Sequence, residues 1–126
     1  MRPVVVSALA LLAAAAGAAL AQTSVRQPTL AGRYGLTQAA CAAKDYFATL
    51  SEAAFSLPTY ACTGVSFDQV ESRGGVETYQ VTATACTGEM VVRAKSDRFL
   101  IVRTQGRIRF HWADGTRGAE LVRCGA

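Results

Sequence analysis

The sequence predicts an α+β domain in which one N-terminal helix packs on an antiparallel meander of about six strands, with two disulfides joining the parts. Three observations lead to this prediction. Apolar residues recur at steps of three and four between residues 40 and 54, whereas from residue 59 onward they alternate with polar residues. Turn signals interrupt the alternating part at short intervals. Four cysteines are spread over both parts: Cys41, Cys62, Cys86 and Cys124.

Residues 1–21 have the pattern of a secretory signal peptide. Arg2 precedes an apolar, alanine-rich run that closes on an A-x-A cleavage site at residues 19–21. We expect residues 22–32, which show no apolar period, to be a flexible lead-in. Residues 33–126 then form a single domain, because a mature chain of about 105 residues can bury one core only. The mature protein is predicted to be exported, either periplasmic or secreted, without a transmembrane segment.

The helix is expected to begin after Thr37, whose side chain can cap the first turn. It must end by residue 57, because Pro58 disfavours helical geometry in the residue before it. The apolar stripe that would pack on the sheet consists of Ala40, Ala43, Phe47, Leu50 and Ala54.

The first two strands, residues 59–69 and 76–87, are predicted to form a hairpin. Its turn lies at Gly74-Gly75, because adjacent glycines adopt positive φ without steric cost. This register places Phe67 opposite Val81, so that large apolar side chains meet.

Four further strands are predicted at residues 89–95, 98–104, 107–112 and 117–124. The short connections Ser96-Asp97, Gln105-Gly106 and Ala113-Asp114-Gly115 have the composition of turns. Residues 99–102 are apolar on both faces, so we expect this strand in the middle of the sheet with both sides at least partly covered. Six twisted strands of this kind favour curling into an incomplete barrel.

The even number of cysteines in an exported chain predicts two disulfides. Their spacing does not suit a zinc site, and the sequence indicates no metal or cofactor. A helix of about 21 Å followed by a returning strand favours pairing Cys41 with Cys62, and Cys86 with Cys124. The hairpin register supports the alternative, in which Cys62 pairs with Cys86 and Cys41 with Cys124.

The strand at residues 107–112 contains the candidate binding site. Arg107, Arg109 and His111 alternate with three large apolar residues and therefore share one face. The functional interpretation is an anion-binding face. The plain alternative is a solvated strand face whose charges discourage edge-to-edge pairing.

The charge distribution favours an anionic partner. From residue 93 onward the chain has eight basic and three acidic residues, whereas residues 22–92 have four basic and six acidic ones. Most of the basic residues are arginines, which bind carboxylate and phosphate in bidentate geometry. An anionic lipid, a polyanion or an acidic protein would fit. Nucleic acid would not, because the compartment is wrong and no nucleic-acid motif is present.

Catalysis is not predicted. The only histidine is His111, and no G-x-S-x-G elbow marks a nucleophile for it. Glu71 and Glu77 flank a hairpin turn, where carboxylates are usually solvated. We therefore expect a non-catalytic binding protein.

Several motifs resemble known groups of exported proteins. Arg33-Tyr34-Gly35-Leu36-Thr37, Tyr60-x-Cys62 and Cys86-x-x-Glu89 look like a loose class of small exported four-cysteine bacterial proteins, which implies no activity. Tyr60-x-Cys62 with the late cysteine Cys124 also resembles the periplasmic inhibitors of c-type lysozyme, which are small β-barrels. The S-G-x-x-Y loop of those inhibitors has no counterpart in this sequence. That second resemblance implies an inhibitor of an envelope hydrolase.

Overall fold

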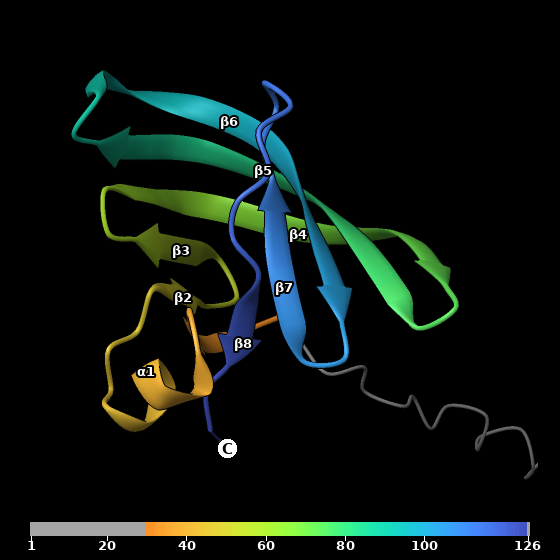
Figure 1. Cartoon of the computed structure of the whole chain (residues 1–126). Coiled ribbons are helices and arrows are strands. Elements are labelled where there is room, and N and C mark those ends of the chain that lie inside the picture. Colours follow the sequence, from red (N-terminus) through yellow and green to blue (C-terminus); the bar gives the residue numbers. More distant parts are fainter. Residues whose placement is uncertain (1–29, 126) are drawn as a thin grey trace, which may run out of the picture.

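The computed structural model describes residues 30–125, and these form a closed barrel of eight antiparallel strands (Figure 1). Each strand pairs with the next one along the chain, and the last pairs with the first. The predicted signal peptide and residues 22–29 of the predicted lead-in lie outside the described residues. The strands are β1 Gly32–Gly35, β2 Ala48–Leu50, β3 Ala54–Leu57, β4 Tyr60–Arg73, β5 Val76–Gly88, β6 Val91–Thr104, β7 Arg107–His111 and β8 Leu121–Arg123.

The predicted α+β class is wrong, because the expected helix is reduced to a single short turn. Helix α1 comprises Gln38–Ala42, and none of its residues is buried. Thr37 caps it as expected, since its side chain accepts a hydrogen bond from the Ala40 N–H. Lys44 has a left-handed φ of 61°, so the chain does not continue as a helix after α1. The alanines of the predicted stripe would bury little apolar area, so packing does not favour a longer helix.

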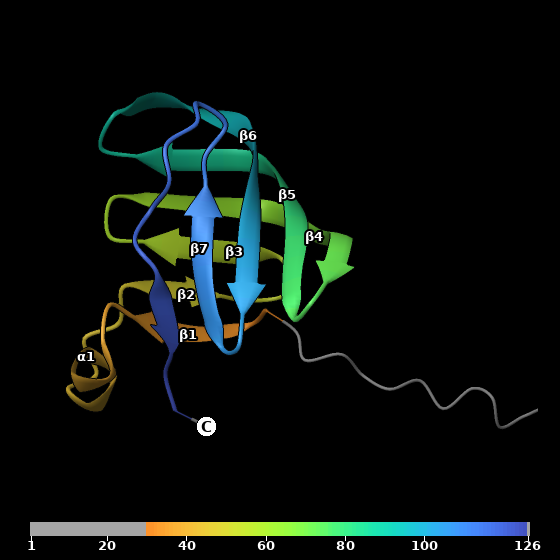
Figure 2. The same cartoon turned by 45° about the vertical axis from the view of Figure 1, so that its right-hand side comes forward.

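Leu50 and Ala54 of that stripe belong to a short hairpin, β2–β3, which lies between β1 and β4 (Figure 2), and Phe47 directly precedes it. Leu50 and Phe55 pair across it, and each is 2 % exposed. Ala48 is also buried, whereas Thr49 between Ala48 and Leu50 is exposed. A strand of three residues shows too little alternation to compete with a helical pattern in the sequence, which is why this hairpin was not predicted.

The hairpin of β4 and β5 confirms its prediction. Phe67 pairs with Val81, and the turn lies at Gly74 and Gly75, whose φ values are 58° and 85°. These positive values explain why two glycines are needed there.

The predicted turn at Ser96-Asp97 is wrong, because β6 runs straight through it. The Asp97 carboxylate accepts hydrogen bonds from the Arg98 N–H and the Tyr60 hydroxyl, so this polar side chain is satisfied within a strand. The predicted meander of about six strands becomes eight, since β1 to β3 are added and two predicted strands merge. With these additions the barrel is closed rather than incomplete.

The two disulfides are Cys62–Cys86 and Cys41–Cys124. The pairing favoured by helix length is therefore wrong, because the helix of about 21 Å on which it depended is replaced by the short α1. The alternative from the hairpin register is correct: Cys62 and Cys86 are directly opposed in β4 and β5. Cys41 in α1 reaches Cys124 just beyond β8, which pairs with β1.

Gly64 explains how both Cys62 and Val65 point into the barrel although they are three residues apart. Its φ is 62°, and a Cβ at this position would lie 2.0 Å from Oγ1 of Thr84 on the facing strand. The left-handed residue shifts the alternation of β4 by one position. Strict alternation along residues 59–69 would place Cys62 and Val65 on opposite faces.

The barrel has two ends, which we name after residues that lie there. The Trp112 end holds the β3–β4 and β5–β6 turns and the loop between β7 and β8. The Glu77 end holds the β4–β5 and β6–β7 turns, the start of β1 and the end of β8. Phe55, Phe99, Phe110 and Trp112 pack together toward the Trp112 end. Among the described residues, no helix is long and apolar enough to cross a membrane.

Candidate functional site

Strand β7 places the three predicted site residues on the outside of the barrel. Ile108 and Phe110 face the core and are 1 % and 3 % exposed. Arg107, Arg109 and His111 occupy the intervening positions and face outward, with Arg107 the most open of the three. The alternation between polar and apolar residues therefore separates the two faces of this strand.

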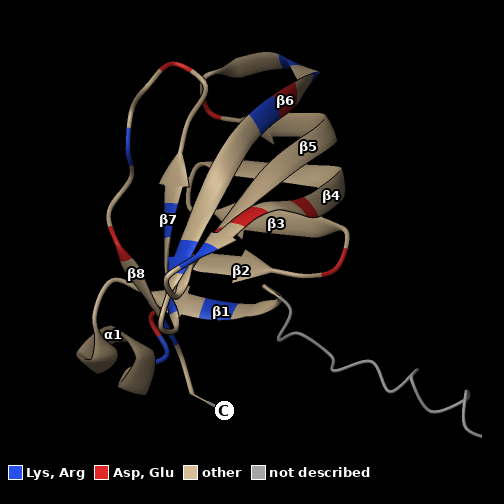
Figure 3. Cartoon of the chain, turned by 90° about the vertical axis from the view of Figure 1, so that its right-hand side faces the viewer, with Lys and Arg blue, Asp and Glu red and all other residues tan. Residues whose placement is uncertain are grey.

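The strand register brings two further arginines to His111. Leu100 of β6 pairs with His111, and a bridge in the loop after β7 pairs His111 with Arg117. Arg98 precedes Leu100 by two residues on the same face of β6. In the amide orientation that places its oxygen toward β6, the Gln80 side chain accepts hydrogen bonds from the Arg98 guanidinium. Figure 3 shows basic positions on β6, on β7 and in the loop that follows β7. We call Arg98, Arg109, His111 and Arg117 the basic face.

Arg107 differs from the basic face because it already has a partner. Its Nη1 lies 3.0 Å from Oε1 of Glu120, and both side chains are about half exposed. Arg98, Arg109 and Arg117 form no ion pair with a carboxylate in the described part of the chain. The structure thus divides the predicted trio: Arg109 and His111 belong to an uncompensated cluster, and Arg107 does not.

Arg109 carries a polar atom without a partner. Its Nε is buried and finds no hydrogen-bond acceptor among residues 30–125. A buried donor left unpaired costs free energy, and such groups in folded proteins usually indicate strain or a function.

The positive charges of the basic face affect the pKa of His111. Burial lowers the pKa of its imidazole below the ordinary value of 6.5, and the charges of Arg117 and Arg109 lower it further. The protonated form is disfavoured because it would add a cation beside two others. An anion placed here would act in the opposite direction and would raise the pKa of His111.

A hollow of about 290 Å³ lies in the same surface. Gln80, Arg98 and His111 supply its polar walls, and Leu100 supplies an apolar one. Leu100 is 37 % exposed and Val102 is half-buried, so the outer face of residues 99–102 is partly covered, as expected, while Phe99 and Ile101 on the inner face are buried. An anion with an attached apolar group would find both kinds of contact here.

The Trp112 end contains a second hollow, which is mainly apolar and has a volume of about 410 Å³. Phe47, Leu57 and Leu121 line it together with Trp112. Beside it, the Tyr60 hydroxyl donates to Asp97, and burial together with this bond raises the pKa of Tyr60 above its ordinary value of 10.0. The tyrosine therefore stays protonated and acts as a fixed link between β4 and β6.

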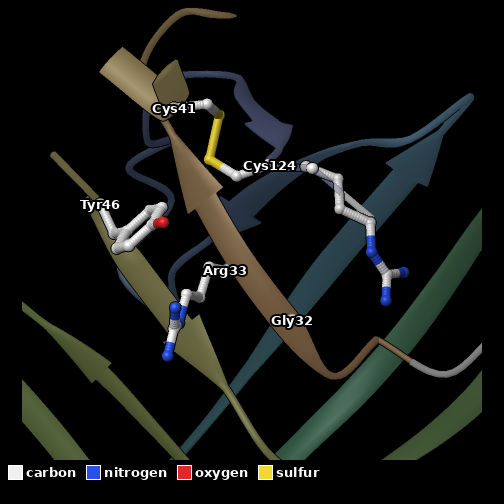
Figure 4. Close-up of a pocket in the computed structure, with 7 residues that line it drawn as sticks. Gly32, Arg33, Cys41, Tyr46 and Cys124 are labelled. Atoms are coloured by element: carbon white, nitrogen blue, oxygen red, sulfur yellow. A yellow bond between two sulfur atoms is a disulfide. The ribbon is translucent and has the colours of Figure 1, made fainter. Parts of the chain in front are cut away.

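A third hollow, of about 430 Å³, lies next to the Cys41–Cys124 disulfide (Figure 4). The Arg33 guanidinium lies 5.1 Å from the centre of the Tyr46 ring, a cation–π arrangement. Arg123, which also lines the hollow, donates to the carbonyl of Ala31. Both arginines therefore have structural contacts, which makes this hollow the weaker candidate for an anion.

The His111 side chain forms no hydrogen bond with a serine or a carboxylate among the described residues. No group of three or more histidine, cysteine or acidic residues in residues 30–125 is placed to hold a metal ion.

Arg98 and Arg117 were not predicted as site residues, although the sequence contains the signal that finds them. A turn centred between Gln105 and Gly106 pairs residues whose numbers sum to 211, which sets Leu100 opposite His111. A turn centred on Asp114 sets His111 opposite Arg117. Both turns are predicted from the sequence, so the two registers follow from the turn positions.

Comparison with models of protein families, with curated proteins and with solved structures finds no match for this chain.

Proposed function

We propose that this protein is a small exported, non-catalytic binding protein that holds an anion-bearing partner on the basic face. The observation that supports this most is the grouping of Arg98, Arg109 and Arg117 near His111, with no ion pair between these arginines and a carboxylate within residues 30–125. Clustered cations of one sign repel one another, and an anionic ligand relieves that repulsion.

The chemistry of the face suits phosphate or carboxylate groups. Guanidinium groups donate two parallel hydrogen bonds to such anions. The hollow beside Leu100 gives the anion a place to enter rather than a flat surface. An anionic envelope component or an acidic protein would meet these requirements.

The proposal of export is supported by the two disulfides, which use all four cysteines. Disulfides persist in oxidising compartments and are rare in the cytoplasm. The pattern of residues 1–21, typical of a signal peptide, is consistent with the same destination, periplasmic or secreted.

The test measures binding of the mature protein to polyphosphate, a soluble polyanion, over a range of salt concentrations. Binding should weaken steeply as salt rises, because exposed charges are screened beyond about 8 Å at physiological ionic strength. The double variant Arg109→Gln/Arg117→Gln should bind at least roughly tenfold more weakly. Arg73→Gln is the matched control, since Arg73 is an exposed arginine at the Glu77 end. Equal binding by all three proteins, or binding that ignores salt, would contradict the proposal.

The closed barrel favours a second candidate, an inhibitor of an envelope hydrolase, because small β-barrels are the architecture of the lysozyme inhibitors that the sequence resembles. The basic face would then contact an acidic surface of the enzyme, since a cationic enzyme would be repelled. This candidate predicts a stable complex with a hydrolase in a pull-down from an envelope extract, together with loss of that hydrolase's activity. Capture without inhibition would speak against it.

A further inference from the structure

The turn between β5 and β6 exposes two aliphatic side chains almost completely. Met90 is 93 % exposed and Val92 is 99 % exposed, more than any other large hydrophobic residue in the described chain. Neither side chain contributes to the core. The two residues are two positions apart at one turn, so both expose their apolar surface at the same place on the barrel.

This turn is firmly attached to the barrel. The Cys62–Cys86 disulfide lies just below it, and the Glu89 N–H donates to the carbonyl of Thr59 in the neighbouring β3–β4 turn. A Cβ at Gly88 would lie 2.3 Å from the Thr59 carbonyl oxygen, so the two turns are in close contact. Figure 1 shows them side by side at the Trp112 end. We call Met90 and Val92 the apolar tip, and these contacts hold the turn that carries it against the barrel.

Cations accompany the tip. Arg93 and Lys95 follow Val92 along β6, both are exposed, and neither forms an ion pair with a carboxylate among residues 30–125. Glu89 is the one acidic residue within the turn. The basic face begins three residues beyond Lys95, at Arg98, and its members His111 and Arg117 also lie toward the Trp112 end. One end of the barrel thus combines an apolar tip with several cations.

An anionic lipid bilayer is the partner that fits this combination. Aliphatic side chains at a convex turn can enter the boundary between headgroups and acyl chains, while flanking cations contact lipid phosphates. Two side chains alone are far too small for a stable protein interface, which buries about 1,200–2,000 Å² in total. A bilayer has no such minimum, because it adds electrostatic attraction from every cation near its surface.

We propose that the Trp112 end docks on an anionic membrane surface, with Met90 and Val92 inserted below the headgroups and Arg93, Lys95 and the basic face at the level of the phosphates. This inference rests on the proposed function, because it identifies the anionic partner of the basic face as a lipid headgroup. It adds an apolar contact that a soluble polyanion would not use.

The test compares binding of the mature protein to phosphatidylcholine vesicles with and without phosphatidylglycerol. Wild type should co-sediment only with the anionic vesicles. Met90→Asp/Val92→Asp should bind them at least roughly tenfold more weakly, since burying a carboxylate in the apolar layer is unfavourable. Val70→Asp/Val76→Asp is the matched control: it makes the same change at exposed valines on either side of the β4–β5 turn, at the Glu77 end. It should bind like wild type.

Binding to polyphosphate, measured with the same variants, distinguishes membrane docking from anion binding by the basic face. Met90→Asp/Val92→Asp should still bind polyphosphate within roughly threefold of wild type, which also shows that the variant is folded. If wild type binds polyphosphate but not anionic vesicles, or if Met90→Asp/Val92→Asp binds vesicles as wild type does, membrane docking is overturned and the proposed function stands. If wild type binds neither ligand, both proposals fail.

Discussion

Arg103 and Arg109 lie next to each other in the β6–β7 ladder but on opposite sides of the barrel wall. Arg103 pairs with Ile108, and Arg109 pairs with Val102 one position further along. The side chain of Arg103 points inward and the residue is 7 % exposed, whereas Arg109 points outward. The inner arginine donates to the Glu77 carboxylate at 2.5 Å and to the Tyr79 hydroxyl at 2.7 Å.

These two arginines differ in whether their charge is balanced within the fold. The charge of Arg103 is balanced by Glu77 and its guanidinium also lies over the Tyr79 ring. Arg109 has no carboxylate partner among the described residues, and its Nε has no acceptor there. We therefore expect substitutions of Arg103 to affect stability and substitutions of Arg109 to affect binding.

The largest effect is expected for Arg103→Met. This change keeps an unbranched side chain of similar length but leaves Glu77 and Tyr79 without their cation, so the free energy of unfolding should fall by about 3 kcal/mol. Arg109→Met should change it by no more than about 0.5 kcal/mol. Urea unfolding with the disulfides intact measures both. Equal losses for the two variants would mean that the two arginines do not differ in role.

A smaller effect is expected for Glu77→Gln, and it should depend on pH. Hydrogen bonds from Tyr79 and Arg103 hold the pKa of the Glu77 carboxyl below its ordinary value of 4.5. The unfolded chain therefore takes up this proton more readily than the folded one. The resulting stability is fully present above the unfolded pKa and is lost as the pH falls through the folded pKa.

Glu77→Gln should accordingly be less stable than wild type by about 1–2 kcal/mol near neutral pH, where the ionised hydrogen bonds are lost. The difference between the two proteins should shrink as the pH falls below about 4.5. Urea midpoints measured along this pH series give the comparison. A difference that stays constant with pH would show that the charge of Glu77 is unimportant to the inner cluster.

The smallest effect is expected for His111→Gln on the pH dependence of polyphosphate binding. Burial, Arg117 and Arg109 lower the pKa of free His111, and a bound anion would raise it, so binding should be accompanied by proton uptake. Wild-type affinity should rise by roughly three- to tenfold as the pH falls through the range below about 6.5. In His111→Gln the curve should be nearly flat. A variant curve that parallels wild type would remove His111 from the site.

The sequence predicted those parts of the fold that carry a regular alternation with turn residues between them. The β4–β5 hairpin was predicted with its register, because Gly74-Gly75 and the pairing of Phe67 with Val81 agree. Strands β1 to β3 were not predicted, since three or four residues are too few to show a period of two. Their formation depends on closing the barrel against β8, a contact between distant parts of the chain.

The candidate site was predicted within one strand but not across strands. Alternation is enough to place Arg109 and His111 together, because it is a local property of β7. Arg98 and Arg117 join the basic face only through the register between β7 and its neighbours. Arg107 is not part of the basic face because it pairs with Glu120, thirteen residues further along the chain. The disulfide pairing also depends on contacts between distant strands. The length of the predicted helix favoured Cys41 with Cys62, but α1 is too short for that geometry, and Cys41 pairs with Cys124.

Because the barrel has eight antiparallel strands, the first strand begins and the last strand ends at the same end of the barrel. Gly32 begins β1 and Arg123 ends β8 at the Glu77 end, far from the β5–β6 turn with Met90 and Val92 (Figure 1). A linker or fluorescent label attached beyond either strand would therefore hold the molecule with its hydrophobic tip pointing away from the support. Immobilised protein would then present that tip to arriving vesicles in one uniform orientation.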